Sequence, residues 1–337
     1  MLKLAIVILN WNGEKYLRQF LPTLVSHIPD YAEIIIADNA STDGSVAFLR
    51  EQYPEMRVIV FPQNGGFSKG YNDAFKQIEA EYYCLLNSDI EVPEHWVEPV
   101  MQLFETDDNI AAIQPKILSY YERNKFEYAG ACGGFIDKYG YPFCRGRVFD
   151  TLEEDCHQYD DAIPVFWATG AALFVRSAVY HQVGGLDEDF FAHMEEIDFC
   201  WRIKNLGYKL MIEPKSHIYH IGGGTLPKSN SRKTFLNFRN NLFLLQKNLP
   251  KNRLFITFAI RCILDNVAAF SFLAKGNIGD FKAVYKAHAE FLKRRKLFKQ
   301  KRVGNEETSF HDLWPSSIVF ENYIGRKKHF DGHRFFN

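Results

Sequence analysis

The 337-residue chain lacks most of the short motifs that identify a metal-binding or cofactor-binding class. Its six cysteines form no C-x-x-C pair, so a zinc site is not expected. Neither a P-loop nor a G-x-G-x-x-G fingerprint is present, and the missing fingerprint argues against the oxidoreductase that a parallel sheet alone would allow. The N-terminal residues show no signal peptide, so we expect a cytoplasmic protein whose cysteines are reduced.

The chain also lacks a large net charge, internal repeats and low-complexity linkers. Its 40 Lys and Arg residues nearly cancel 41 Asp and Glu residues, so no nucleic-acid partner is expected. Hydrophobic residues make up 47% of the sequence, which suffices for a globular core. The length suits one large domain with an extension, or two domains.

What the first 90 residues do contain is a regular alternation of short apolar runs and helical patterns. The expected strands are Leu4–Leu9, Glu33–Ala37, Val58–Phe61 and Tyr82–Leu86. Each run ends in small or polar residues, and a helical pattern follows each of the first three. This alternation predicts an α/β fold with a doubly wound, mostly parallel sheet. Ligands of such sheets bind outside the carboxyl ends of the strands.

The most informative strand end is Asn87-Ser88-Asp89, which follows the apolar run Tyr82–Leu86. One amide and one carboxylate, two residues apart, can both reach a divalent cation. Mg²⁺ prefers oxygen ligands and keeps substrate phosphates as partners. The segment therefore indicates a metal–diphosphate site, although Asn, Ser and Asp are also ordinary turn formers.

Five polar motifs occur in order along the chain, each at the end of an expected element. They are Asn10-Trp-Asn-Gly, Asp38-Asn-Ala-Ser-Thr-Asp-Gly-Ser, Asn64-Gly-Gly-Phe-Ser-Lys-Gly-Tyr-Asn, Leu86-Asn-Ser-Asp and Glu195-Glu-Ile-Asp-Phe-Cys-Trp-Arg. Together they resemble the family-2 inverting glycosyltransferases of the GT-A fold, and in particular the rhamnosyltransferase-like members of bacterial polysaccharide assembly. The resemblance covers Lys3 to Thr225.

The resemblance implies a metal-dependent hexosyl- or deoxyhexosyltransferase that uses Mg²⁺ or Mn²⁺. Its donor would be a dTDP- or UDP-sugar, and its acceptor a glycan or a polyprenyl-linked sugar of the cell surface. The implied donor contacts are Asn10, Asn12, Asp38, Gly65, Gly66, Lys69, Asn87 and Ser88. Asp38 would accept a hydrogen bond from a pyrimidine N–H, or alternatively cap a helix. Gly65 and Gly66 would permit close approach of the donor, or form a plain loop.

The metal and the catalytic base are also implied by the resemblance. Asp89 corresponds to the metal-binding Asp of the family's D-x-D motif, and His220 would complete the metal shell, with His217 as the competing histidine. In the acidic cluster Glu195, Glu196 and Asp198, the family's base falls on Glu196, with Asp198 as the alternative. Otherwise these acids are solvated residues favoured by the dipole of a helix start.

The acceptor side would be lined by Trp167, Thr169, Gly170 and Arg202. For Trp167 the alternative is core packing, and Arg202 could instead hold the acidic cluster in place. Asn87 and Glu196 both replace an Asp that many family members have. These departures motivate a different function, a non-catalytic sugar-nucleotide or glycan-binding subunit of an assembly complex.

From Phe235 onward the sequence becomes rich in Phe- and Leu-containing helical segments. We therefore expect a catalytic domain over residues 1–228 and a mainly helical extension over residues 229–337. The apolar segment Leu254–Leu273 contains Arg261 and Asp265 and is too interrupted for a membrane span. With the basic run Lys293–Arg302 it predicts contact with an anionic membrane at its cytoplasmic face, or alternatively a homo-oligomer interface.

Overall fold

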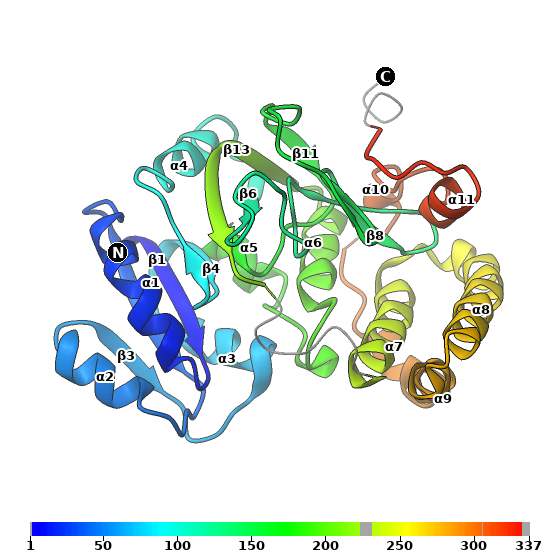
Figure 1. Ribbon diagram of the computed structural model, residues 1–337, viewed down its shortest axis with the longest axis horizontal. Coiled ribbons are helices and arrows are strands. Elements are labelled where there is room, and N and C mark those ends of the chain that lie inside the picture. Colours follow the sequence, from blue (N-terminus) through cyan, green and yellow to red (C-terminus); the bar gives the residue numbers. More distant parts are fainter. Residues whose placement is uncertain (1, 223–230, 305, 332–337) are drawn as a thin grey trace.

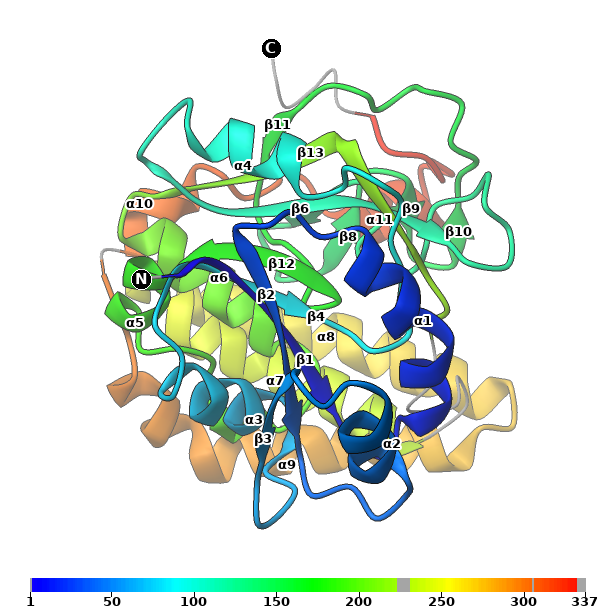
Figure 2. The same cartoon turned by 90° about the vertical axis from the view of Figure 1, so that its left-hand side faces the viewer.

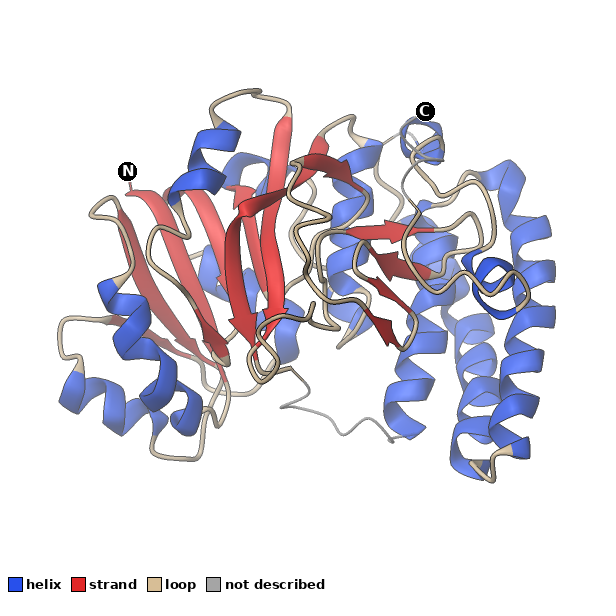
Figure 3. Ribbon diagram, turned by 45° about the horizontal axis from the view of Figure 1, so that its top comes forward, coloured by secondary structure: helices blue, strands red, loops and turns tan. Residues whose placement is uncertain are grey.

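The computed structural model describes residues 2–222, 231–304 and 306–331, and it confirms the α/β class. A large mixed sheet occupies one side of the molecule and a group of long helices the other (Figure 1). A small antiparallel sheet lies between them (Figure 3). The expected boundary between residues 228 and 229 and part of the expected glycine-rich loop, residues 223–225, lie outside the described residues.

The large sheet has nine strands in the order β11-β13-β6-β12-β4-β1-β2-β3, with β5 paired to β13. Its strands are β1 (Leu2–Asn10), β2 (Ala32–Asp38), β3 (Arg57–Val60), β4 (Ala80–Leu86), β5 (Ile90–Glu91), β6 (Ile110–Ser119), β11 (Ile163–Val165), β12 (Ala172–Arg176) and β13 (Lys209–His220). The four expected strands are β1 to β4, and they run parallel. β12 lies antiparallel between β4 and β6, and β6 and β13 are again parallel. The sheet is thus mostly parallel.

Helices cover both faces of this sheet because successive strand residues point to opposite faces. The helices of this half are α1 (Glu14–Ser26), α2 (Ser45–Gln52), α3 (Gly66–Phe75), α4 (Glu98–Phe104), α5 (Ser177–Gln182) and α6 (Glu195–Asn205), with the short 3₁₀ turn η1 (Glu188–Phe190). In β1, Ile6 belongs to the core under α1, α2 and α4, whereas Val7 belongs to the core under α3, α5 and α6. Figure 2 shows α1 and α3 on opposite sides of β1.

The irregular region between residues 120 and 161 contains hairpin-like strands. They form a four-stranded antiparallel sheet of β7 (Gly134–Ile136), β8 (Pro142–Cys144), β9 (Arg147–Val148) and β10 (Thr151–Leu152). Phe135 and Phe143 of this sheet share a core with Trp314 near the C-terminus. The small sheet therefore connects the half that contains the large sheet to the C-terminal segment.

The C-terminal part is helical, as expected. Its helices are α7 (Ser231–Asn248), α8 (Lys251–Ala274), α9 (Ile278–Gln300), α10 (Glu306–Phe310) and α11 (Ile318–Tyr323). α7 and α9 pack together, with the rings of Phe243 and Phe298 stacked 3.8 Å apart. These two rings belong to the same hydrophobic core as Phe199 and Trp201 of α6. α7 and α9 are thus part of the same hydrophobic core as α6, in the half that contains the large sheet.

Candidate active site

The ends of β1 and β2 place Asn10 and Asp38 side by side, and both side chains are fully buried. Asn10 Nδ2 donates to Asp38 Oδ1 at 2.9 Å and to Ser41 Oγ at 3.1 Å. The Ser41 N–H donates to Asp38 Oδ2 at 2.9 Å. Within the described part of the chain, Asn10 Oδ1 is buried and has no partner. The pair therefore offers one free acceptor beside a carboxylate, which suits an N–H group of a ligand.

The residues around this pair shape the loops that follow β1 and β2. Asn12 Oδ1 accepts from the Thr42 N–H at 2.7 Å, which ties the two loops together. Gly13 is packed so closely that an added Cβ would lie 2.4 Å from Asn10 Oδ1 and 3.4 Å from Ser88 Oγ. Ser88 therefore borders the same recess as Asn10.

The glycine loop is held by a residue that the sequence reading missed. The side chain of Asn39 accepts from the Gly65 N–H at 3.0 Å and donates to Gly66 O at 3.1 Å. Gly66 has a φ of +79°, a conformation that favours glycine. Lys69, a predicted donor contact, instead pairs with Asp73 one turn later on α3 at 2.7 Å. The only signal for Asn39 was its position next to Asp38.

The end of β4 and the end of β13 bring Asp89 and His220 together. His220 Nε2 lies 3.2 Å from Asp89 Oδ1, and Nδ1 lies 3.1 Å from Glu127 Oε2. Asn87 Nδ2 lies 3.5 Å from His220 Nε2. Burial alone would lower the pKa of His220, but hydrogen bonds to both carboxylates raise it to about 10. His217, the competing histidine, packs edge-to-face on Tyr219 instead.

This arrangement fits a divalent cation only in part. Asp89 Oδ1 and His220 Nε2 converge on one point, and Glu127 holds the far ring nitrogen as an outer carboxylate does in many metal sites. His220 would have to lose its Nε2 proton to bind the ion. Among the described residues, no three His, Cys, Asp or Glu side chains form a complete cage. The site thus suits an ion that takes its remaining ligands from a diphosphate.

The acidic cluster at the start of α6 divides into two environments. Glu195 is 6% exposed, Glu196 keeps part of its surface in solvent, and in the described structure Oε2 of each has no partner. Burial, followed by the charge of Glu196, raises the pKa of Glu195 well above its usual range, and burial also raises the pKa of Glu196. Glu196 is thus the less buried of the two carboxylates, and its spare oxygen Oε2 is itself buried.

Asp198, the alternative base, is fully buried and fully engaged. Oδ2 accepts from Arg202 Nε and Lys247 Nζ, each at 2.8 Å, and Oδ1 accepts from Asn248 Nδ2 at 2.8 Å. Its complete burial and its three bonds to Arg202, Lys247 and Asn248 favour a structural role for Asp198 and leave Glu196 as the better candidate base.

The four residues predicted for the acceptor side lie in different environments. Trp167 is 4% exposed and donates from Nε1 to Phe135 O at 2.9 Å, so it packs in the core. Thr169 is buried, and its N–H donates to Gln114 Oε1 at 2.9 Å. Arg202 is buried and bound to Asp198, which corrects its assignment to the acceptor side. Only Gly170 faces the cluster: an added Cβ would lie 3.7 Å from Glu196 Cβ.

Gly170 also links the acidic cluster to Asp89 and His220. The next residue, Ala171, accepts at its carbonyl from the Asn87 N–H at 2.9 Å. Glu196 and the Asn87–Asp89 turn therefore lie on either side of the segment Gly170-Ala171. Five of the predicted residues, namely Asn10, Asp38, Asp89, Glu196 and His220, form what we call the strand-end site.

The loop that enters α6 is strained and is held by α7. Phe191, His193 and Met194 have φ values of +69°, +67° and +71°, a region that non-glycine residues avoid. Asn240 Nδ2 lies within hydrogen-bonding distance of three carbonyls of this loop, at 2.8 to 2.9 Å. Such strain persists only when neighbouring contacts fix it. No motif pointed to Asn240, because it lies outside all five of them.

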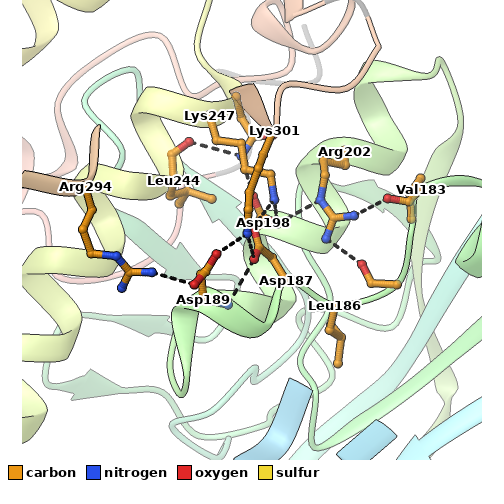
Figure 4. A network of polar contacts seen from close by, with 12 residues as sticks. Val183, Leu186, Asp187, Asp189, Asp198, Arg202, Leu244, Lys247, Arg294 and Lys301 are labelled. Atoms are coloured by element: carbon orange, nitrogen blue, oxygen red, sulfur yellow. Dashed lines mark hydrogen bonds and ion pairs between the residues drawn. The ribbon is translucent and has the colours of Figure 1, made fainter. Parts of the chain in front are cut away.

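A second polar cluster joins α6 to the C-terminal helices, and we call it the helix junction (Figure 4). Its members are Asp187, Asp189, Asp198, Arg202, Lys247, Asn248, Arg294 and Lys301. Lys247 bridges Asp187 at 2.7 Å and Asp198 at 2.8 Å, and Arg294 contacts Asp189 at 2.6 Å. Burial would raise the pKa of Asp187, but Lys247 and Lys301 together lower it to about 2.

Comparison with known proteins agrees with this geometry. Residues 5–166 match the family model Glycosyl transferase family 2. N-acetylglucosaminyl-diphospho-decaprenol L-rhamnosyltransferase of Mycobacterium tuberculosis strain H37Rv is 23% identical over 232 residues, which make up 64% of this chain and 75% of the relative.

Two solved structures show a similar fold. The chain aligns to Staphylococcus aureus TarS 1–349 in complex with UDP-GlcNAc with a TM-score of 0.55 and 15% identity, covering 99% of this chain and 95% of that one. It aligns to GalNAc-T7 with UDP, GalNAc and Mn²⁺ with a TM-score of 0.56 and 16% identity, covering 73% of this chain and 48% of that one. At these identities the likeness establishes the GT-A fold.

Proposed function

Because this chain is a glycosyltransferase with a family 2 domain over residues 5–166, we propose that it transfers a sugar, with inversion, from a nucleotide-diphosphate sugar to a lipid-linked acceptor. The observation that carries this proposal is the strand-end site itself. It combines a buried acceptor pair, a carboxylate–histidine pair and a free carboxylate along one edge of the sheet. These three parts correspond to base recognition, diphosphate binding and proton removal.

The donor nucleotide would bind at Asn10 and Asp38. Among the residues that the structure describes, Asn10 Oδ1 is a buried acceptor with no partner, and leaving such a group unpaired costs free energy that a ligand N–H would recover. A pyrimidine ring N–H between Asn10 and Asp38 satisfies this condition, which favours a dTDP- or UDP-sugar. Gly65 and Gly66, fixed by Asn39, let the backbone approach the donor closely.

The diphosphate would lie between the glycine loop and Asp89. Asp89 and His220 would hold a divalent cation, Mg²⁺ or Mn²⁺, with Glu127 orienting the histidine ring. Such an ion neutralises the charge that develops on the departing nucleoside diphosphate. Asn87 lies beside the pair and adds a neutral amide.

Glu196 would act as the general base on the acceptor hydroxyl. Its spare oxygen takes the hydroxyl proton while the acceptor oxygen forms a bond to the anomeric carbon. The bond from that carbon to the diphosphate breaks at the same time, and its electron pair leaves with the nucleoside diphosphate. Attack from the face opposite the leaving group inverts the anomeric carbon. The raised pKa of Glu196 makes it a stronger base than an ordinary carboxylate.

The acceptor would be a polyprenyl-diphosphate-linked sugar at the cytoplasmic face of the cell membrane. The supporting observation is the printed name of the mycobacterial relative, whose acceptor is carried on decaprenol. In this proposal residues 1–228 carry the chemistry and residues 229–337 position α6 and approach the membrane. This division concerns function and not folding, because α7 and α9 share the hydrophobic core of the catalytic half.

The test is a panel of dTDP- and UDP-sugars, assayed for transfer with and without Mn²⁺ and followed by NMR of the anomeric proton. We expect one donor to support metal-dependent transfer with inversion. The variant Asp89→Ala should lose Mn²⁺-stimulated binding of the nucleoside diphosphate, measured by calorimetry, while its melting temperature is unchanged. Unchanged metal-stimulated affinity in this variant would show that Asp89 is not a metal ligand. Donor binding without any transfer would instead indicate a binding subunit.

A further inference from the structure

Helix α8 exposes an unusually apolar face. Five of its large apolar side chains are between 57% and 87% exposed, namely Phe255, Ile256, Ile263, Val267 and Phe270. They recur at helical spacing and lie on one side of the helix. By length and composition, α8 is the one helix in the described residues that is long and apolar enough to cross a bilayer.

The two charged residues in the middle of α8 point toward the protein. Arg261 and Asp265 are almost completely buried and pair with each other at 3.0 Å. Asp265 also contacts His288 of α9 at 2.9 Å and Tyr141 at 3.2 Å. Arg261 donates to Tyr139 O at 3.1 Å. These contacts fix the rotation of α8, so its apolar face stays outward. They also bind its polar face to the protein, which favours a helix lying on a membrane over one spanning it.

The neighbouring helix α9 adds a basic surface. Between Lys251 and Gln300, every exposed charged side chain is basic, although the whole chain has a net charge of −1. They are Lys251, Arg253, Lys275, Lys282, Lys286, Lys293, Arg295, Lys296 and Lys299. Tyr285 of α9 donates to Asn266 of α8 at 2.8 Å, and the rings of Phe270 and Phe281 lie 5.8 Å apart. The apolar face of α8 and the exposed side of α9 are therefore neighbours.

We infer that α8 and α9 form a docking surface for an anionic lipid bilayer. The apolar face of α8 inserts at the boundary between headgroups and acyl chains, and the basic side chains of α9 contact the lipid headgroups. A second copy of the chain is a poorer occupant, because it would bring the same basic charges against this surface. The inference rests on the proposed lipid-linked acceptor, which such docking would hold close to the catalytic half.

The experiment is flotation of the full-length protein with vesicles of phosphatidylcholine alone or mixed with phosphatidylglycerol. We expect binding to the mixed vesicles, weakened by salt, and little binding to phosphatidylcholine alone. Ile263→Ser/Val267→Ser should abolish the binding. Lys282→Gln/Lys296→Gln should weaken it at least tenfold, about the effect of two basic residues near an anionic surface. The matched controls are Ile324→Ser, an exposed apolar residue in the C-terminal segment, and Lys215→Gln on β13.

The outcomes separate docking from catalysis. All variants should keep wild-type transfer to a water-soluble acceptor, because none of them touches the strand-end site. No binding to mixed vesicles, in protein that still transfers, would overturn the docking surface and leave the proposed function intact. If the wild type is a dimer and Ile263→Ser/Val267→Ser makes it monomeric, the surface would be assigned to a second copy of the chain. If the wild type binds vesicles but transfers no sugar, the proposed function fails and the docking surface stands.

Discussion

The strand-end site and the helix junction both gather buried charged or polar groups, yet they satisfy them very differently. In the helix junction each carboxylate oxygen of Asp187, Asp189 and Asp198 has a cationic or amide partner, and the amide oxygen Asn248 Oδ1 is the one buried polar side-chain atom of this cluster that has no partner among the described residues. Near the strand-end site Asn10 Oδ1, Glu195 Oε2 and Glu196 Oε2 have none among the described residues. Unpaired buried polar atoms reduce stability, so a protein that retains them gains something other than stability.

The contrast is sharpest within α6, where Glu196 and Asp198 are two residues apart. Glu196 faces Gly170 and the end of β4, whereas Asp198 faces Lys247 and Asn248 of α7. Position on the helix thus decides which acid is available for chemistry and which holds the structure. Four changes test this division, and they are ordered from the largest expected effect to the smallest.

The first change, Glu196→Gln, keeps the shape of the side chain but removes its ability to take a proton. We expect turnover to fall by ~10²–10⁴-fold, as is usual when a general base is lost. Donor affinity and melting temperature should be unchanged, because no partner of Oε2 is lost. Glu196→Asp should keep part of the activity. The measurement is steady-state transfer, with Glu195→Gln as the neighbouring control. A near-wild-type kcat in Glu196→Gln would show that another group acts as the base.

The second change, Asp198→Asn, should act on stability. It leaves Lys247 and Arg202 without their shared carboxylate inside the protein. Breaking a buried ion pair in this way costs about 3–5 kcal/mol in the free energy of unfolding. Urea unfolding measures it, with Asp73→Asn on the surface of α3 as the control, where about 1 kcal/mol or less is expected. If both variants were equally stable, the helix junction would not be the structural cluster that we describe.

The third test uses pH on the helix junction. The pKa of Asp187 falls from 3.8 to about 2, because Lys247 and Lys301 outweigh the effect of burial. The unfolded chain therefore binds more protons than the folded protein between these values. About 2 kcal/mol of stability should be present above pH 4 and be lost as the pH falls toward 2. Urea unfolding at several pH values should show a weaker acid dependence in Asp187→Asn than in wild type. Equal slopes would contradict the assignment.

The fourth change, Asn240→Ala, tests whether the C-terminal half supports the strand-end site. It removes the amide that contacts three carbonyls of the strained loop before α6. Losing about one buried hydrogen bond should lower kcat roughly tenfold through misplacement of Glu196, with little change in donor KM. Asn237→Ala, one turn earlier on α7, is the matched control. An equal loss in both variants would point to a general effect on α7.

Much of the fold followed from local patterns. The runs Leu4–Leu9, Glu33–Ala37, Val58–Phe61 and Tyr82–Leu86 all became strands, because short apolar runs that end in polar loops have few other stable arrangements. The direction of β12 was not predictable, since periodicity gives no information on the pairing partner.

The site was only partly predictable for a related reason. Asn10, Asp38 and Asp89 mark strand ends, so their meeting at one edge follows from a parallel sheet. Glu127 was missed because it lies 93 residues before its partner His220, in the irregular region. Lys247 was missed because its helix looks like any amphipathic segment until α6 is placed against it. Long-range partners of this kind become visible only in three dimensions.

The outward-facing side of α8 also provides a position for a spectroscopic probe. Of the six free cysteines, only Cys156 and Cys262 are exposed, and Cys262 lies on this helix. In a Cys156→Ser background, a maleimide-linked fluorophore would therefore label a single position under native conditions. Its emission would report the polarity around the helix, and a lipid-soluble quencher would report its depth. One thiol thus allows the surroundings of α8 to be followed in real time during catalysis.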